Sequence, residues 1–487
     1  MDEHVPLKGG LLSAIQKGAA DKSKVWRVLY ILGLIACIFF SYYRYIDVSH
    51  GGAIITYLLY PLSICIMSLL LFTCDYAKYI EIKFLGAFIV WTILVALLHY
   101  GDSDTLLGGW FQSVVITIIL CFSVAYAFQA STQKKLVSIF AVATITPAFL
   151  LSILALILVA LNRKFTLSNV EGVLGFGEEG RLELFCHANI SAAMCGLSLL
   201  LSLYLLLVYK KKAVRIVTPV LILVFYIALS LTDSRTGIIS TAIAVALFFL
   251  FFGKESIRKK KMFLRVFLCV LIALAVPVCF YFGTALVRVA YNATLANSGT
   301  VQNEAPVSEQ SEPYQADVSQ SPSPADSPEI LTDESQAVSS RDLSDAGTFN
   351  GRTGIWLGTL RGLLENPKIL ITGTTPPQAG IKMTPYFPES APKYNFHNSY
   401  VAALVSYGAV GFLFIAAFLL ALAVKCVKLV FGKRATSDYE MLFLPVILFF
   451  AVLEGMMEQF LFVDSMPTII WVWLMFAAGI VFRRSHA

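Results

Sequence analysis

The chain has 487 residues, of which 57% are apolar and only 14% are charged, and its formal net charge at pH 7 is +6. Its mean hydropathy is +0.75, whereas soluble globular domains are close to half apolar and a quarter charged. This balance excludes an ordinary soluble protein and predicts a membrane protein.

The apolar residues gather in blocks long enough for a helix to cross the roughly 30 Å hydrocarbon core of a bilayer. They predict an all-α fold, a polytopic transmembrane helical bundle with about twelve spans. The short spans on either side of residues 233–237, and the two after residue 441, could instead be hairpins that dip into the bilayer and return. In chain order the predicted spans are 25–43, 53–74, 82–99, 110–128, 136–161, 188–209, 216–232, 237–252, 263–286, 399–424, 441–456 and 467–482.

Lysine and arginine residues set the predicted orientation, because cytoplasmic loops retain them. With the N-terminus inside, about 25 of the 37 Lys and Arg residues lie on the cytoplasmic side. An even number of spans then places both termini in the cytoplasm. The net positive charge is therefore a sign of topology, and nucleic-acid binding does not follow from it.

The predicted organisation places most polar sequence on the outer side. A cytoplasmic tail (1–24) leads into spans one to nine (25–286), a large extracytoplasmic loop (287–397), spans ten to twelve (398–482) and a short cytoplasmic end (483–487). A smaller outer loop, 162–187, follows the fifth span. These two outer loops are where we look for function.

The large loop has two parts of different composition. Residues 297–348 are rich in Ser, Pro, Gln, Glu and Asp and predict a disordered acidic insert. In the ordered part, 349–397, residues 354–364 carry apolar side chains at helical spacing, and Asn366–Pro367 ends that pattern. This segment predicts an amphipathic helix, either at the membrane surface or packed in a small outer subdomain.

Four segments occur in order on the predicted outer side. They are GRLELFCHANISA (180–192), DSRTG (233–237), NGRTGIWLGTLRGLLENP (350–367) and HNSYVAALVSYGAVG (397–411). Together with the span pattern, the region from about residue 170 to 420 resembles the O-antigen ligase and O-antigen polymerase superfamily of membrane glycosyltransferases. The acidic insert is not part of that pattern, and Cys186 to Asn189 match only loosely the Asn-Pro-Asn type sequence often found there.

The resemblance implies transfer of a glycan from a polyprenyl-diphosphate carrier to a hydroxyl acceptor, at the non-cytoplasmic face of the cell (cytoplasmic) membrane. It assigns Arg235, Arg352 and, less directly, Arg181 to the diphosphate, because arginine forks hold phosphate bidentately. His397 matches the family's motif histidine and would take the acceptor proton, in one displacement with inversion. No metal ion or cofactor is required, and apolar grooves between the spans would hold the polyprenyl tail.

The other polar residues near the outer span ends have two interpretations each. His187 and Asn398 could contact sugar or acceptor, or they could only shape the ends of spans. Glu454 and Glu458 could bind sugar or orient His397, or they could be solvated loop-end acids. The arginines could only anchor to lipid headgroups, and His397 could be only a helix-start residue. Gly408 and Gly411 would permit close helix packing.

Two activities fit the implied chemistry. A polymerase takes a second lipid-linked glycan as acceptor, and a ligase takes a surface acceptor; we favour the polymerase, the broader use of this scaffold. The alternative is a transporter or flippase of a lipid-linked glycan or polar solute, which should show related halves or acids in the middle of spans. We see no related halves, and no Asp or Glu lies in the middle of the first ten predicted spans. A non-catalytic assembly factor is a third possibility.

Overall fold

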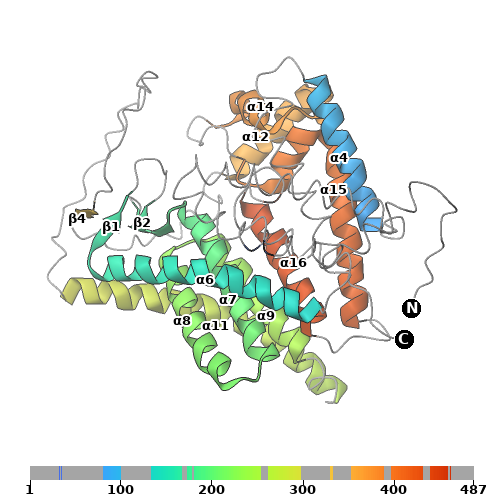
Figure 1. Cartoon of the computed structure of the whole chain (residues 1–487). Coiled ribbons are helices and arrows are strands. Elements are labelled where there is room, and N and C mark those ends of the chain that lie inside the picture. Colours follow the sequence, from blue (N-terminus) through green and yellow to red (C-terminus); the bar gives the residue numbers. More distant parts are fainter. Residues whose placement is uncertain are drawn as a thin grey trace.

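The computed structural model describes residues 80–99, 133–166, 173–177, 180–253, 261–297, 330–332, 352–388, 396–431 and 439–458, together with Leu32, Ile35 and Leu461. Figure 1 shows a mostly helical protein with a small sheet at one side. In chain order the elements are α4 (Ile80–Leu98), α6 (Gln133–Ala160), β1 (Arg163–Phe165), β2 (Leu174–Phe176), β3 (Leu182–Leu184), α7 (Ala188–Val208), α8 (Lys212–Leu231), α9 (Arg235–Phe252), α11 (Met262–Asn297), β4 (Ile330–Thr332), α12 (Arg352–Glu365), α13 (Pro367–Thr372), α14 (Pro376–Met383), the 3-10 helix η4 (Thr384–Tyr386), α15 (Ser399–Phe431) and α16 (Tyr439–Met457).

Seven of the described helices are long and apolar enough to cross a membrane. They are α4, α6, α7, α8, α9, α11 and α15, and each matches a predicted span; the predicted span at 441–456 is the shorter apolar helix α16. Since α8 and α9 have 20 and 18 residues, they are long enough to span, and dipping hairpins are not needed there. A multi-span helical membrane protein is thus confirmed, whereas the total of twelve spans and their orientation stay predictions. The spans predicted at 25–43, 53–74, 110–128 and 467–482 lie outside the described residues, apart from Leu32 and Ile35.

Helix α7 forms the centre of the bundle, and it packs against α6, α8, α9 and α16 (Figure 1). Small residues let the neighbouring helices approach closely. Gly196 of α7 faces Thr241 of α9, and Gly237 of α9 faces Ala192 of α7. This close approach brings the start of α9 beside the start of α7, where most of the candidate site lies.

Helix α15 is broken at Gly408, whose φ of +66° lies in the left-handed region. The carbonyls freed at the break accept hydrogen bonds from elsewhere in the chain. The backbone N–H of Thr374 donates to Val405 (3.0 Å), and the indole N–H of Trp91 on α4 donates to Tyr407 (2.7 Å). A bilayer offers no water to such groups, so an interrupted span needs these internal partners.

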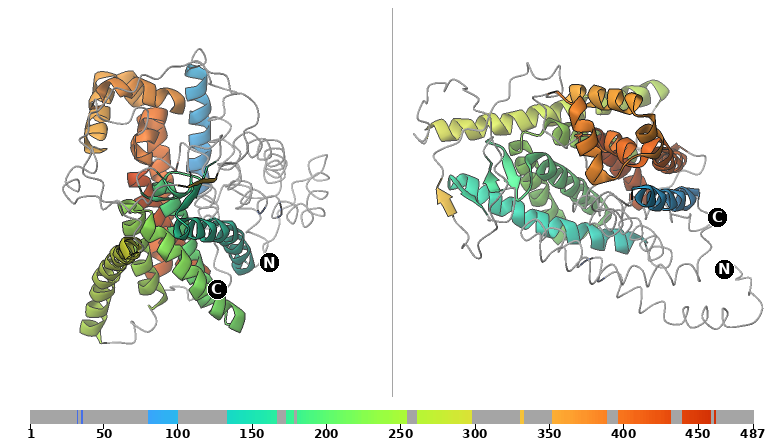
Figure 2. Two further views of the ribbon diagram at one scale, coloured as in Figure 1. Left: turned by 90° about the vertical axis from the view of Figure 1, so that its left-hand side faces the viewer. Right: turned by 90° about the horizontal axis from the view of Figure 1, so that it is seen from above.

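The backbone of Gly373, between α13 and α14, lies directly against the backbone of α15 at the break. A Cβ on Gly373 would meet the backbone of Gly408, and its own φ is +78°. Helices α4 and α15 lie side by side here (Figures 1 and 2). The predicted close packing at Gly408 and Gly411 is present, with Gly411 against Trp91, but the sequence pattern missed the interruption at Gly408.

Two segments that we predicted on the outer side differ from the predictions. The loop at 162–187 contributes β1, β2 and β3 to an antiparallel sheet of order β3-β2-β1-β4, and β4 comes from within the insert that we expected to be disordered throughout. Three-residue strands are too short for periodicity to reveal. Helix α11 continues to Asn297, past the predicted end at residue 286, because residues 287–297 contain no Gly or Pro to stop it.

The predicted amphipathic helix is present as α12. Its buried residues Ile355 and Leu363 face inward, and Leu363 packs in a small core with Met383 of α14 and Phe396. On the opposite side Leu357 is 68% exposed and Leu364 is 72% exposed. One face therefore packs in a small subdomain, and the exposed apolar face is compatible with the membrane-surface alternative.

We expect Gly408→Ala to destabilise the protein. The added Cβ would lie 2.5 Å from the backbone nitrogen of Gly373, and an alanine held at φ +66° and ψ 178°, a region essentially open only to glycine, costs about 1–3 kcal/mol. Gly86→Ala in α4 is the matched control, because nothing lies within 4 Å of its added Cβ. Thermal unfolding of the detergent-solubilised protein should show a lower Tm for Gly408→Ala only; equal Tm values would contradict the strained break.

Candidate active site

The candidate active site lies where several helix ends meet at one end of the bundle. The end of α16, the starts of α7, α12 and α15, and the turn between α8 and α9 all contribute polar side chains. Glu458, directly after α16, is at the centre. We call Glu458, Arg352, Asn189, Arg181 and His397 the Glu458 cluster.

Glu458 contacts three of the other cluster members directly. Its Oε1 accepts hydrogen bonds from Arg352 Nη2 and from Asn189 Nδ2, both at 2.7 Å. Its Oε2 lies 3.6 Å from Nδ1 of His397. Arg352 also donates through Nη1 to the carbonyl of Met457 (2.7 Å), so its position is fixed by two contacts at the end of α16.

The surroundings of Glu458 keep it ionised. Burial alone would raise the pKa of its carboxyl, but the side-chain interaction with His397 and the positive charge of Arg352 outweigh burial and hold the pKa below its usual range. The side chain is only 13% exposed. The alternative that Glu458 is a solvated loop-end acid is therefore wrong.

Arg181 joins the cluster through Asn189. Its Nη2 donates to Asn189 Oδ1 (2.7 Å), and its Nε donates to the carbonyl of Thr232 (2.9 Å). Arg181 is 3% exposed. Asn189 therefore bridges Arg181 and Glu458, a role that sequence reasoning missed, since a polar residue in the first turn of a span more often shapes its end.

His397 sits in a distorted backbone just before α15, with a φ of +47°. Two following residues fix this segment to the end of α16. Asn398 donates to the carbonyl of Met456 (2.8 Å), and Ser399 donates to the carbonyl of Glu458 (2.7 Å). The ring of His397 thus faces Glu458 with Nδ1, which favours the tautomer that leaves Nε2 as the proton acceptor.

The other predicted contact residues divide by role. Asn398 Oδ1 accepts from the backbone N–H groups of Tyr400 and Val401 and so caps α15, while its Nδ2 donates to the carbonyl of Met456 on α16. His187 is the N-cap of α7, with Nδ1 accepting from the N–H of Asn189. These contacts support the helix-end interpretation of Asn398 and His187.

Glu454 lies one turn before Glu458 on α16 and is fully buried. Its Oε1 accepts a hydrogen bond from Ser240 of α9, and its Oε2 has no hydrogen-bond partner among the described residues. Glu454 is therefore not a solvated acid, and with Glu458 it faces α9 and α7.

The turn between α8 and α9 carries Arg235. Asp233 has a φ of +48° and forms an ion pair with Arg288 of α11. Ser234 then caps α9, accepting from the N–H of Gly237 (3.3 Å), and Arg235 is the first residue of that helix. Arg235 is half-buried and lies three residues after Thr232, whose carbonyl accepts a hydrogen bond from Arg181. Sequence reasoning did not single out Arg288, whose partner is 55 positions away.

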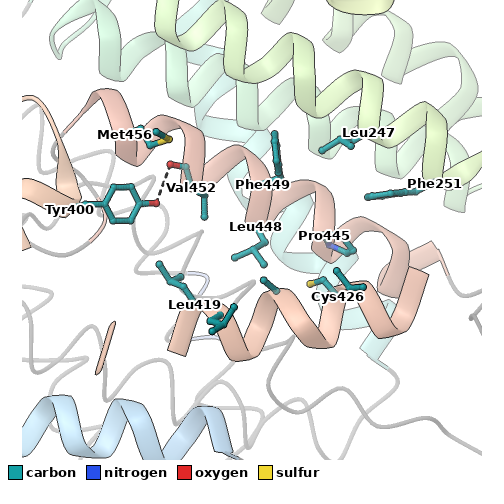
Figure 3. A pocket seen from close by; sticks show the side chains of 13 residues that line it. Leu247, Phe251, Tyr400, Leu419, Cys426, Pro445, Leu448, Phe449, Val452 and Met456 are labelled. Carbon is teal, nitrogen blue, oxygen red and sulfur yellow. Dashed lines mark hydrogen bonds between the residues drawn. The ribbon is translucent and has the colours of Figure 1, made fainter. Parts of the chain in front are cut away.

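An apolar groove of about 570 Å³ opens between α9, α15 and α16 (Figure 3). Tyr400 and Met456 stand at one end, directly beside Asn398 and Glu458. We call it the α15–α16 groove, and its lining is Leu247, Phe251, Tyr400, Leu419, Leu420, Ala423, Cys426, Val427, Pro445, Leu448, Phe449, Val452 and Met456. The Glu458 cluster therefore lies next to the apolar α15–α16 groove.

Residues 219–416 match a family model described as O-antigen ligase. No curated protein matches the chain. The matched segment contains Arg235, Arg352 and His397, whereas Arg181 and Glu458 lie outside it and join them only in the folded chain. The family resemblance predicted from the sequence is confirmed. Among the described residues, no group of three or more His, Cys, Asp or Glu side chains could hold a metal ion.

We expect Glu458→Gln to lower stability at neutral pH by about 3 kcal/mol, because it leaves buried basic groups without their anion. Since the folded pKa of Glu458 is lowered, its contribution is present above the ordinary glutamate value of about 4.3 and is lost as pH falls through the folded pKa. The Tm of the variant should therefore fall less than that of the wild type on acidification below about pH 4.3.

The matched control is Glu365→Gln in the exposed pair Arg361–Glu365, where little change in stability is expected because solvent screens the pair. Thermal unfolding at pH 7 and at several acidic values measures both variants. Equal stability of Glu458→Gln and Glu365→Gln at pH 7 would contradict the central role of Glu458.

Proposed function

We propose that this protein is a membrane glycosyltransferase that moves a glycan from a polyprenyl-diphosphate carrier to a hydroxyl acceptor, because residues 219–416 match a family model described as O-antigen ligase. The family match supports the general class of O-antigen ligase and polymerase activity. The observation that carries the finer proposal is the Glu458 cluster, in which arginines, a histidine and a carboxylate converge beside an apolar groove. We place the reaction at the extracytoplasmic face of the cell membrane.

Arg352 and Arg235 bind the diphosphate in this proposal. When the sugar leaves, negative charge develops on the phosphate oxygens, and guanidinium groups stabilise it by charge and by paired hydrogen bonds. Arg352 keeps donors beyond those used on Met457 and Glu458. Arg181 is buried and occupied by Thr232 and Asn189, so we assign it to positioning and not to direct contact.

His397 acts as the general base. Its Nε2 takes the proton of the acceptor hydroxyl while that oxygen attacks the anomeric carbon. The bond from the anomeric carbon to the diphosphate oxygen breaks in the same step, its electron pair leaves with the diphosphate, and the configuration inverts. The negative charge of Glu458 beside Nδ1 stabilises the imidazolium that forms. No metal ion or cofactor takes part in this scheme.

The α15–α16 groove holds the polyprenyl tail in this proposal. Its lining carries little polar surface, because the hydroxyl of Tyr400 donates to the carbonyl of Val452 (3.0 Å; Figure 3). Along α16 it runs from Met456 to Pro445, about 17 Å at the helical rise. A carrier with its diphosphate at the Glu458 cluster could therefore lay the first part of its tail along the groove.

Both acceptor classes remain compatible with this chemistry. A polymerase would take a second lipid-linked glycan, and a ligase would take a surface acceptor; we favour the polymerase. The transporter alternative receives less support, because the residues of the Glu458 cluster gather where helix ends meet and not at a midplane site.

We expect His397→Asn to reduce glycan transfer by about 100-fold or more, the usual effect of losing a general base. Asparagine is chosen because it tolerates the φ of +47° at this position. Transfer is measured with purified protein, and the glycan profile is measured in cells whose only copy carries the variant.

The cellular profile also separates the activities. Single lipid-linked repeats should accumulate for a polymerase, and long lipid-linked polymer should accumulate for a ligase. An unaltered profile would rule out His397 as the base. Loss of precursor export, with transfer intact, would instead support the transporter.

We expect Ala423→Trp to fill the α15–α16 groove and to raise the KM for a long-chain donor about tenfold, which corresponds to ~1.4 kcal/mol. A donor analogue with a very short tail should be unaffected. Leu413→Trp is the matched control, since Leu413 is a 64% exposed residue of α15 outside the groove. Equal KM changes for the long-chain donor and the short-tailed analogue would show that the groove does not bind the donor's tail.

A further inference from the structure

Arg288 and Asp233 join α11 to the turn between α8 and α9. Their side chains form an ion pair, with 19% of Arg288 and 5% of Asp233 exposed. Arg288 lies on the extension of α11 beyond its predicted end, and α11 packs against both α8 and α9. Asp233 is buried and Arg288 is partly buried, so removing one partner leaves the other charge without compensation.

The turn that this pair anchors has three consecutive residues with separate tasks. The carbonyl of Thr232 accepts from Arg181 Nε (2.9 Å), Asp233 pairs with Arg288, and the hydroxyl of Ser234 caps α9. Arg235 follows at once. A displacement of the turn would therefore move the support of Arg181 and the start of Arg235 together.

The backbone of the turn also needs an external anchor. Asp233 has a φ of +48°, a conformation that non-glycine residues adopt at a cost and that Asp and Asn tolerate best. The carboxylate of Asp233 contacts a guanidinium on another helix, so the ion pair holds the strained residue in place. Strain of this kind persists where surrounding contacts over-determine it.

We propose that Arg288 and Asp233 are a positioning pair that sets the geometry of Arg235 and Arg181 for an anionic diphosphate. The inference rests on the proposed function for the identity of that ligand. Neither residue touches the reacting atoms. Arg288 acts through Asp233, and Asp233 acts through the backbone on either side of it.

The variants remove the charges while sparing the backbone. Arg288→Gln and Asp233→Asn each leave one charge unpaired, and Asn keeps the left-handed conformation accessible at residue 233. The double variant Asp233→Asn/Arg288→Gln removes both charges, and Arg288→Lys preserves the positive charge. The matched control is Arg361→Gln, which breaks the exposed pair with Glu365.

Two measurements are made on the full-length protein in detergent. Hydrogen exchange of peptides covering residues 232–238 reports on the turn, and we expect about tenfold faster exchange in each single variant. The Kd for a polyprenyl diphosphate without glycan should rise about tenfold in the same variants. Arg288→Lys should keep the exchange rate and the Kd close to their wild-type values. The double variant should be no worse than the worse single variant in either measurement. Arg361→Gln should match the wild type.

The outcomes separate this inference from the proposed function. Unchanged exchange in Arg288→Gln, or faster exchange with an unchanged Kd, would overturn the positioning role. An equal rise of the Kd in Arg361→Gln would overturn it as well. If the wild type binds polyprenyl diphosphate but transfers no glycan, the proposed function fails while the positioning pair stands on the exchange and binding data.

Discussion

The structure of the site depends on one buried carboxylate. Glu458 lies where the ends of five segments meet, and it holds Arg352, Asn189 and His397 within reach of a single side chain. Several basic groups could not converge at a bundle end without an anion among them, because their mutual repulsion and lost hydration would be uncompensated. The anion in turn is stable there only because these partners lower its pKa.

The position of that carboxylate follows from how the bundle closes around it. Helix α15 is interrupted at Gly408, so its first part, from Ser399 to the break, is held separately by Gly373 and Trp91. This short first part carries His397 on its leading end and is tied by Ser399 to the carbonyl of Glu458. An interrupted span in a bilayer requires that every freed carbonyl find an internal donor. The contacts of Trp91 and Thr374 therefore hold the interrupted helix in place, and with it the segment that carries the histidine.

The sequence predicted the features that are local. The apolar blocks predicted the described spans, and the order of the motifs indicated Arg352 and His397 as site residues. It could not predict Glu458 as the centre, because its partner Asn189 is 269 positions away. It missed Arg288 for the same reason, and it missed the sheet because strands of three residues have no readable period. The break at Gly408 was also hidden, since a glycine in a span fits close packing equally well.

In the proposed reaction, the same carboxylate also limits how strongly the site would bind a diphosphate donor. Arg352 is paired with Glu458, so a diphosphate must share this guanidinium with an anion already in place. A site without Glu458 would carry more positive charge, but its arginines and His397 would lose the contacts that fix their directions. Catalysis depends on stabilising charge where it develops in the transition state, and directed donors serve this better than a larger but unordered charge. A buried glutamate beside the arginines that we propose to bind phosphate is therefore consistent with turnover, because a carrier diphosphate that must leave after each transfer cannot be held too tightly.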